Sequence, residues 1–378
     1  RETNSSRRDL RSKQSYFLAE AGIEDILWRM RTGRQYAPSQ SVSINGLSAT
    51  VSISVTGGQG VVESTGEVAG AIRRARAALR SGTGVSFVYG VQVGDLGLEM
   101  GNNSSVIGNV YSNGDIAGGG KMVTTITGTA IAALNHLIKD IRINGDAYAD
   151  RFDNCIVNGT AHYVTSFTAN CTAGATVADV SPQPPGAFPI TQQQIDAWKA
   201  EAAAGGTLSG YNAGNDATVT LGPKKINGNL SFGNNVVLTL TGTVWVTGTI
   251  GLGNSNTIRL NPGTYGESSG MLITDSAVDL GNTVSLQGTG QPGSYLMLLS
   301  TFGPSDAIDV GNSATGAILY APNGIIEIGN SLSLREATGR GLRTGNGTSI
   351  TYESGLANVN FISGPTGGWS ITSWNEIK

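Results

Sequence analysis

One short phrase recurs seven times in this chain of 378 residues. An alternating aliphatic stretch leads into Gly-Asn, and a second aliphatic stretch follows. The copies read LEMGNNSSV, LSFGNNVVL, IGLGNSNTI, VDLGNTVSL, IDVGNSATG, IEIGNSLSL and LRTGNGTSI. Short strands joined by identical tight turns cannot each bury a core, but stacked as successive coils they can. The recurrence therefore predicts a mainly β protein that forms a right-handed parallel β-helix, a solenoid, from residue 85 onward.

The turns are unevenly spaced. From Gly233 to Gly345 the intervals are 20, 28, 30, 18 and 16 residues. This spacing favours a β-helix with loops inserted at one corner over a strict hexapeptide prism. We expect Gly to supply backbone freedom at each bend. Asn would tolerate left-handed backbone there and stack its amide on the Asn of the next coil.

Composition limits the classes of function. Charged residues make up 13% of the chain, Gly occurs 55 times, and the net charge is −3. Low charge with ample Val, Ile, Leu and Thr is typical of a β-rich protein and not of a disordered one. The slightly acidic balance offers no basic footprint for nucleic acid, so no nucleic-acid partner is expected.

The first 84 residues predict an α+β unit that precedes the coils. Residues 4–31 show apolar side chains at three-, four- and seven-residue steps, the pattern of an amphipathic helix, and Gly33 would end it. Asn45-Gly46 predicts a hairpin. Strands are expected within 42–55, 61–68 and 71–79, with a junction at 81–84. We assign a helix to 1–33 and a small antiparallel sheet to 34–84.

The coils are interrupted once. The stretch SPQPPGAFP predicts an extended linker, and Thr191 to Ala204 predicts a helix that opens with a Thr191/Gln194 capping box. Its face with Ile195 and Trp198 would brace a coil. Because terminal coils need caps, we expect Trp369 and Trp374 to close the last one. The predicted divisions are a first coil section, a linker with helix, and a second coil section, at 85–180, 181–206 and 207–378.

Two cysteines, Cys155 and Cys171, stand in one polar stretch. As a disulfide they would close a short loop, which exported proteins favour. Two free buried thiols are an alternative. A metal reading is weak, because two thiols without a local His cluster make an incomplete site. The sequence therefore predicts no metal and no cofactor.

Two motifs have the letters of enzyme sites without their context. GTGQPG at 288–293 matches a dinucleotide-binding pattern, but strand-like SYLMLLS follows where a helix must open. GESSG at 266–270 matches a nucleophile elbow, which needs a later His. Both histidines, His136 and His162, come before Ser268. We interpret GTGQPG as a loop between coils, and we expect neither motif to form an enzyme site.

Carboxylates and tyrosines leave two alternatives open. Glycosidases hold two carboxyl groups about 5–9 Å apart, and coil stacking could align Asp275, Asp279, Asp306, Asp309 and Glu327. Three of these stand two residues before a Gly-Asn turn, which is more simply a solvated outward ladder. Tyrosines that recur about once per coil could grip sugars or form an internal stack. They are Tyr265, Tyr295, Tyr320 and Tyr352.

The opening helix carries a family resemblance. The run AEAGIEDILWRM resembles the segment after the membrane helix in the PilX-type N-terminal region of type IV pilus assembly proteins. The matching positions are Ala19, Glu20, Ala21, Gly22, Glu24, Ile26, Leu27 and Trp28. The strands up to Arg80 resemble the sheet that such proteins form next. Two features depart from the pattern: the apolar first half of the pilin helix is not in this chain, and a β-solenoid is far from an ordinary pilin head.

The resemblance implies export, a membrane anchor before assembly through a segment missing from this chain, and incorporation into a pilus or pseudopilus at the cell surface. Other pilin subunits would be the partners, and a surface glycan or host-cell ligand could meet the coils. The assembly residues would be Phe17, Leu18, Ala21, Ile26 and Leu27. We expect a structural or adhesive subunit that is not an enzyme. The alternatives are a secreted β-helical carbohydrate-active enzyme and a cytoskeletal β-helical polymer.

Overall fold

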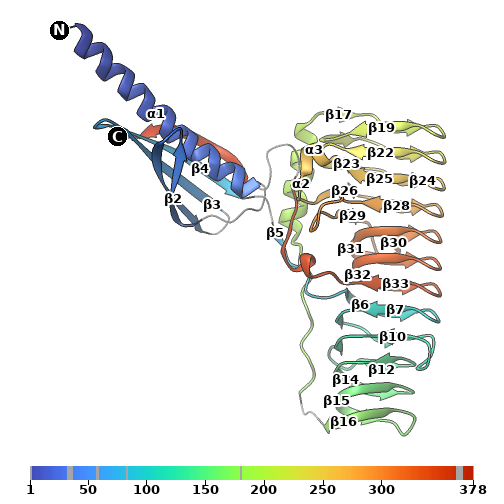
Figure 1. Cartoon of the computed structure of the whole chain (residues 1–378). Helices are drawn as coiled ribbons and strands as arrows, with labels where there is room; N and C mark the ends of the chain where they lie inside the picture. Colours follow the sequence, from blue (N-terminus) through green and yellow to red (C-terminus); the bar gives the residue numbers. More distant parts are fainter. Residues whose placement is uncertain are drawn as a thin grey trace. The chain divides into compact units, whose positions relative to one another are not determined.

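The computed structural model describes residues 2–31, 37–56, 59–81, 84–178, 181–362 and 369–377. The predicted helix stop at Gly33 and the centre of the predicted junction, 82–83, lie outside these residues. The chain forms two compact units (Figure 1). The first consists of Arg1–Gly84, Asn360–Ile362 and Thr366–Lys378, and the second of Val85–Val359 with Ser363–Pro365. The second unit is thus an insertion within the sequence of the first.

The first unit packs a helix on an antiparallel sheet, as predicted. The helix is α1 (Glu2–Arg31). The strands run in the order β1 (Ser39–Ile44), β2 (Leu47–Thr56), β3 (Gln59–Val68), β4 (Ala71–Ser81) and β35 (Trp369–Ile377). The predicted hairpin at Asn45-Gly46 is confirmed, because both residues have positive φ, 51° and 79°. A second tight turn at Ala69-Gly70 joins β3 to β4 in the same way, with φ of 48° and 83°.

The fifth strand overturns a prediction about the C-terminus. Trp369 and Trp374 do not close a coil: both lie on β35, which pairs antiparallel with β4. Trp374 stands opposite Ala77 and packs against the core of the first unit. Without β35, the edge of β4 would leave its backbone N–H and C=O groups unpaired. The segment 369–377, in which apolar and polar residues alternate, forms hydrogen bonds with these groups. The second coil section therefore ends well before residue 378.

Two glycines let the helix of the first unit approach its sheet closely. A Cβ atom on Gly22 would lie 2.9 Å from a methyl carbon of Val51, and one on Gly66 would lie 2.8 Å from the backbone nitrogen of Ala19. Real Cβ atoms do not come this near to such neighbours. The core between helix and sheet is accordingly made of small and branched side chains, among them Ile23 and Val62 at 0% exposure.

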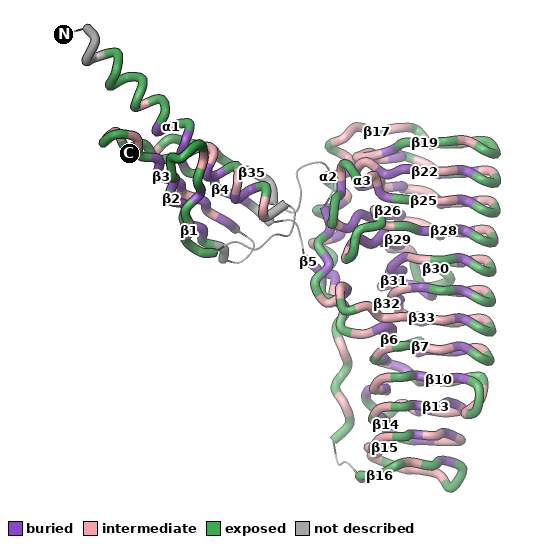
Figure 2. Tube along the Cα trace, in the orientation of Figure 1, coloured by how far each residue is buried: buried purple, intermediate pink, exposed green. Residues whose placement is uncertain are grey.

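The second unit stacks short parallel strands coil upon coil. We call this the coil stack, residues 91–178 and 207–351. Ile250 on β24 (Ile250–Leu252), for example, lies in register between Leu230 on β21 (Leu230–Phe232) and Val278 on β27 (Val278–Leu280). Along these strands, buried residues alternate with outward ones (Figure 2). The molecule is thus mainly β, with an N-terminal helix, an antiparallel sheet and a large parallel sheet, as the sequence predicts.

Most coils contribute three short strands. Those of the first section are β6 (Val91–Met100), β7 (Ser105–Ile107), β8 (Val110–Ser112), β9 (Ile116–Ala117), β10 (Thr125–Ile126), β11 (Ala130–Ala132), β12 (Leu137–Lys139), β13 (Arg142–Ile143), β14 (Ala147–Asp153), β15 (Ile156–Phe167) and β16 (Thr172–Ala178). Two short strands, β5 (Gly84–Val85) and β34 (Val359–Asn360), pair with each other.

The remaining strands of the second section are β17 (Thr207–Leu208), β18 (Tyr211–Ala213), β19 (Thr218–Leu221), β20 (Lys224–Ile226), β22 (Val237–Leu240), β23 (Val244–Val246), β25 (Thr257–Leu260), β26 (Gly270–Thr274), β28 (Ser285–Gln287), β29 (Leu296–Ser300), β30 (Asp306–Val310), β31 (Thr315–Ile328), β32 (Ser333–Thr344) and β33 (Ser349–Thr351). A short helix, α3 (Pro262–Tyr265), and a 3-10 turn, η1 (Ser354–Asn358), interrupt or follow them. A longer strand such as β31 pairs with three successive strands, β28, β29 and β30.

The order of the coils in space differs from their order in the sequence. The chain starts the stack at β6, in its middle, and winds to β16 at one end (Figure 1). The extended segment 181–190 then leads to α2 (Gln192–Ala204), and the coils resume at β17 at the opposite end. The last coils pair with the first ones, β32 with β6 and β33 with β7. The two predicted sections therefore form one stack.

The repeated glycine is needed for a reason other than the predicted one. The left-handed backbone falls on the residue after the asparagine, with φ of 59° at Ser255 and 58° at Thr283. The glycine lies where the backbones of adjacent coils approach closely. A Cβ atom on Gly281 would lie 2.7 Å from the carbonyl carbon of Gly253. Any larger residue would push the coils apart.

The asparagines stack as predicted. Each side-chain Oδ1 accepts a hydrogen bond from the backbone N–H of the asparagine in the next coil, at 2.7 to 2.9 Å. We call this the asparagine ladder, Asn215, Asn234, Asn254, Asn282, Asn312, Asn330, Asn346 and Asn102. It crosses the join between the two sections, because the Oδ1 of Asn346 accepts from Asn102. The turns at the join are therefore held by the same asparagine hydrogen bond as the turns within each section.

The linker helix is confirmed as a brace. Thr191 and Gln194 form both bonds of the predicted capping box. Ile195 and Trp198 are 1% and 2% exposed on the face that packs toward the coils. Near the other end of the stack, Cys155 and Cys171 form a disulfide that joins the β15 coil to the start of β16.

Candidate functional site

The predicted assembly residues of α1 divide between two faces. Leu18, Ile26 and Leu27 are 5%, 0% and 6% exposed, because they pack against the helix's own sheet. Phe17 is 64% exposed and Ala21 is half-buried. The assembly role of these five residues stays a prediction, but burial within the first unit leaves only Phe17 and Ala21 with surface to offer a partner. The other three form the core of the first unit.

The exposed side of α1 carries a second apolar stripe. Leu10, Phe17 and Trp28 are 57%, 64% and 47% exposed. Their separations of seven and eleven residues are whole numbers of helical turns, so they line one face opposite the buried one. We call Leu10, Phe17, Ala21 and Trp28 the outer stripe. Sequence reasoning overlooked Leu10 and Trp28 as site residues, although their spacing from Phe17 was the available signal.

Charges flank the outer stripe unevenly. At 3.6 residues per turn, Arg7 and Arg11 lie on one side of it and Glu20 and Glu24 on the other. The basic pair also lies about 20 Å along the axis from the acidic pair, at 1.5 Å per residue. The face is therefore apolar along its centre, basic toward one end and acidic toward the other.

The predicted carboxylates of the coil stack form a column only in part. Asp279, Asp309 and Glu327 are successive partners on adjacent coils, followed by Arg343 and Glu99. Arg343 forms ion pairs with Glu99 and Glu327 at 3.5 and 3.8 Å. Partial burial and neighbouring carboxylates raise the pKa of Asp309. Within the described ranges, no three His, Cys, Asp or Glu side chains are arranged to hold a metal ion.

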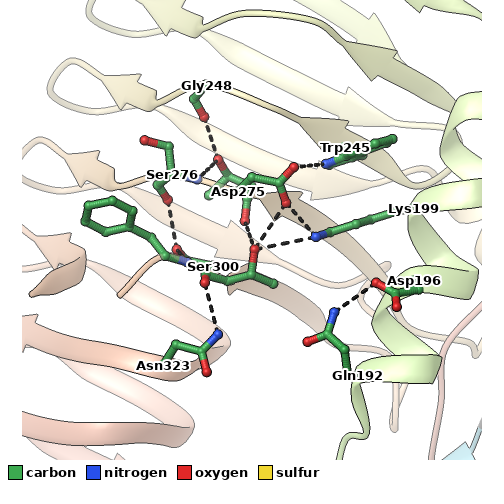
Figure 3. Close-up of polar contacts among 12 residues, drawn as sticks. Gln192, Asp196, Lys199, Trp245, Gly248, Asp275, Ser276, Ser300 and Asn323 are labelled. Atoms are coloured by element: carbon green, nitrogen blue, oxygen red, sulfur yellow. Dashed lines mark hydrogen bonds and ion pairs between the residues drawn. The ribbon is translucent and has the colours of Figure 1, made fainter. Parts of the chain in front are cut away.

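Asp275 lies apart from this column and anchors the linker helix (Figure 3). Its carboxylate pairs with the Lys199 ammonium at 2.5 Å and accepts hydrogen bonds from Trp245 Nε1 at 2.9 Å and from the Thr301 hydroxyl at 3.1 Å. Lys225 Nζ lies 4.2 Å from the centre of the Trp245 ring. These contacts join α2 to three successive coils, and Asp275 is engaged in that brace.

The tyrosines do not form an exposed sugar-gripping stack. Tyr265, Tyr295 and Tyr320 are 2%, 8% and 0% exposed. Burial raises the pKa of each, that of Tyr295 to about 12. The hydroxyl of Tyr352 donates to the Phe87 carbonyl at 2.6 Å, and that of Tyr295 donates to Glu353 at 2.9 Å. These residues fasten segments of the coil stack to one another.

The two enzyme-like motifs lie in loops, which confirms the prediction for GTGQPG. GTGQPG at 288–293 leads into strand β29, so the helix that a dinucleotide site needs does not follow it. GESSG at 266–270 lies between α3 and strand β26. The GTGQPG loop lines a groove of about 890 Å³ on one face of the coil stack, together with Asn261 and Pro262, which precede GESSG in the chain. Sequence reasoning did not predict this groove.

The chain was compared with family models, curated proteins and solved structures. No family model and no curated protein matches it. A solved structure to which it is similar is the crystal structure of the competence-associated pilin ComZ from Thermus thermophilus, with a TM-score of 0.31, 9% identity, and 97% of each chain covered. Identity and TM-score are both too low for this likeness to support a function. Within the described residues, no helix has the length and hydropathy to cross a bilayer.

Proposed function

We propose that this chain is an exported, non-catalytic pilin-like subunit of a type IV pilus or related surface filament, of the PilX N-terminal type. The observation that carries the proposal is the outer stripe of α1. A helix that already buries one face against its own sheet presents a second apolar face with Leu10 and Phe17 more than half exposed. In a monomer this apolar face would remain in contact with water, whereas in a bundle of helices neighbouring helices would bury it.

The size of the stripe favours a bundle over a simple dimer. Fully burying a large apolar side chain contributes about 1.5–3 kcal/mol. Covering the exposed halves of Leu10, Phe17 and Trp28 would contribute roughly 2–5 kcal/mol. Association costs about 4–15 kcal/mol in lost freedom of motion, so one such contact is too weak. Several helix neighbours, together with an apolar segment upstream, would supply the rest.

The charges beside the stripe point to a like helix as the occupant. If two copies lie parallel and are shifted by about 20 Å, Arg7 and Arg11 of one come beside Glu20 and Glu24 of the other. Without a shift, the basic pair of one copy and the acidic pair of the other would lie about 20 Å apart along the axis and could not meet. The charge pattern thus favours the staggered packing of a helical filament over a blunt pair.

The coil stack would be the part that meets partners outside the filament, as an adhesive surface. We interpret its register, in which every coil pairs in parallel with the next, as a right-handed parallel β-helix. The disulfide between Cys155 and Cys171 supports an extracellular location, because such bonds persist in oxidising compartments.

A second candidate function rests on the carboxylate column. Asp279 and Asp309 are paired on adjacent coils, and the pKa of Asp309 is raised. A secreted β-helical carbohydrate-active enzyme would need such a pair. Release of reducing sugars from polysaccharide by the native chain, lost in Asp309→Asn, would favour the enzyme.

Assembly in producing cells tests the proposal. The gene with its natural upstream sequence is expressed with Leu10→Ser/Phe17→Ser, and the subunit is measured in sheared surface filaments. We expect at least a tenfold loss, while Asp9→Ser/Lys13→Ser, an exposed ion pair on the same helix, stays within twofold of the native chain. Equal incorporation of both variants would refute assembly through the outer stripe.

The stagger has its own test. Arg11→Glu and Glu24→Arg should each lower incorporation, because each places like charges together across the contact. The two changes combined should restore it. Additive loss in the double variant would contradict the register.

A further inference from the structure

Two loops build one wall of a groove on the coil stack. Residues 261–269 separate β25 from β26, and residues 288–295 separate β28 from β29 on the next coil. The same corner one coil earlier, between β22 and β23, needs only residues 241–243. The extra length is thus confined to two adjacent coils. Together they border the groove of about 890 Å³.

Hydrogen bonds hold the two loops to each other. The Thr289 hydroxyl donates to the Gly266 carbonyl at 2.6 Å, and the Ser294 hydroxyl donates to the Ser268 carbonyl at 2.8 Å. The backbone N–H of Thr289 donates to the Ser294 hydroxyl at 3.0 Å. Because these bonds fix the loops before any ligand arrives, binding would cost little ordering of the wall.

The floor is a column of side chains at corresponding positions of successive coils. Thr239, Arg259 and Gln287 are register partners on three successive coils. The next two coils place Ala317 and Arg335 at the following positions, since Gly316 pairs with both Leu286 and Leu334. Ala317, 4% exposed, interrupts the row of long side chains and forms part of the groove lining.

The groove carries one cation without a carboxylate. The Nε of Arg259 donates to the Thr239 hydroxyl at 3.1 Å, and no ion pair of Arg259 occurs in the described part of the chain. Arg335, in contrast, pairs with Glu353 at 2.9 Å, and the other oxygen of Glu353 accepts from Tyr295 at 2.9 Å. Glu353 is therefore occupied, and Arg259 keeps donors for a ligand anion.

From this geometry we infer that the groove binds a carboxylated saccharide. The Arg259 guanidinium pairs with the sugar carboxylate, which matches its planar donors. Gln287 and Thr289 bind hydroxyl groups, and the rings of Pro262 and Pro292 border the groove with apolar surface. Nucleic acid would need several cations to balance successive phosphates, and the lining offers one uncommitted arginine.

The inference deepens the adhesive part of the proposed function and rests on that part alone. It does not require filament assembly, because binding is measured on the isolated full chain. Failure to bind would leave assembly through the outer stripe intact. Failure to assemble would leave the groove intact.

Titration calorimetry with trigalacturonic acid and neutral galactotriose tests it. The native chain should bind the carboxylated trimer at least tenfold more tightly than the neutral one. Arg259→Gln should weaken that binding at least tenfold, and Gln287→Ala should weaken binding of both trimers. Arg343→Gln, an exposed arginine on the coil stack that does not line the groove, should bind like the native chain.

Several results would overturn the inference. They are no binding of trigalacturonic acid by the folded native chain at millimolar concentration, equal affinity for the two trimers, native affinity in Arg259→Gln, or displacement of the trimer by single-stranded DNA. Far-ultraviolet circular dichroism of each variant establishes that it is folded. If Arg259→Gln does not fold, the inference is tested by Gln287→Ala and by the affinities of the native chain for the two trimers.

Discussion

Glu336 gives the sharpest prediction from the coil stack. Its side chain lies inside β32 at 0% exposure, where Oε1 accepts from the Thr338 hydroxyl at 2.5 Å and Oε2 has no hydrogen-bond partner in the described structure. Burial raises the pKa of this carboxyl well above its usual value. The charge of Glu336, when ionised, contributes to the raised pKa values of two tyrosines, Tyr320 and Tyr352. Burial therefore favours the neutral form of this carboxyl over the ionised form.

The sign of the pH dependence follows directly. In the unfolded chain Glu336 loses its proton near pH 4.5, whereas the folded chain keeps it to higher pH. The contribution of the neutral carboxyl is thus fully present below pH 4.5 and is lost as the pH rises toward the folded pKa. The loss is at most about 1.4 kcal/mol per pH unit.

Glu336→Gln removes the titration at nearly constant shape. Urea unfolding of the native chain and the variant is measured at pH 4.5, 5.5 and 6.5, and the difference in unfolding free energy is plotted against pH. We expect the variant to gain on the native chain by up to about 1.4 kcal/mol per unit. A constant offset can arise from the amide's own hydrogen bonding, so the slope decides. A difference that does not change with pH would refute the reasoning.

Two further changes probe the packing of the coil stack. Gly281→Ala should lower the unfolding free energy by about 1–3 kcal/mol, because its Cβ would meet the Gly253 backbone. In the control Gly251→Ala, no atom lies within 4 Å of the new Cβ, so the unfolding free energy should change by less than about 0.5 kcal/mol. Equal effects of the two substitutions would contradict close packing at the turn. Lys199→Met leaves the Asp275 carboxylate without its ion pair and should cost about 1–3 kcal/mol in urea unfolding. It should also expose α2 to limited proteolysis, and unchanged cleavage would contradict the brace.

Local sequence patterns were enough to predict the elements. The seven Gly-Asn turns, the Asn45-Gly46 hairpin and the Thr191 capping box each depend on residues within a few positions of one another. Such short-range chemistry is read directly from the chain. The stacking of the asparagine amides also follows from the repeat, because every turn offers the same donor and acceptor.

The order of the coils could not be predicted for the same reason. The turns at Asn102 and Asn346 offer the same bonds as all the others, so nothing local tells which coil stacks on which. The alternation in β35 indicates a strand, but its partner β4 lies about three hundred residues earlier. The pairing of β35 with β4 and that of β32 with β6 depend on the whole fold, because only the folded chain presents the unpaired edges of β4 and β6.

The two faces of α1 show a limit of periodicity. Leu18 and Ile26 face the sheet, while Leu10 and Phe17 face solvent, yet all four are apolar residues at helical spacing. A helix with two apolar stripes does not reveal which one its own domain buries. Gly22 was the clue, because a glycine in a helix interior indicates close approach, and it lies on the buried face.

The join between the two coil sections can be tested by a single crosslink. Ser105 on β7 and Ser349 on β33 are register partners, with their hydroxyl oxygens 3.4 Å apart, and paired strands are spaced within the range of a disulfide. In Ser105→Cys/Ser349→Cys, mild oxidation should give an intramolecular bridge that mass spectrometry finds in the monomer. Ser105→Cys/Ser285→Cys, whose second site lies several coils away, should stay reduced. Free thiols in the first variant, or equal bridging in both variants, would contradict the central claim. That claim is that the first and the last coils of the chain pair with each other in the middle of one continuous stack.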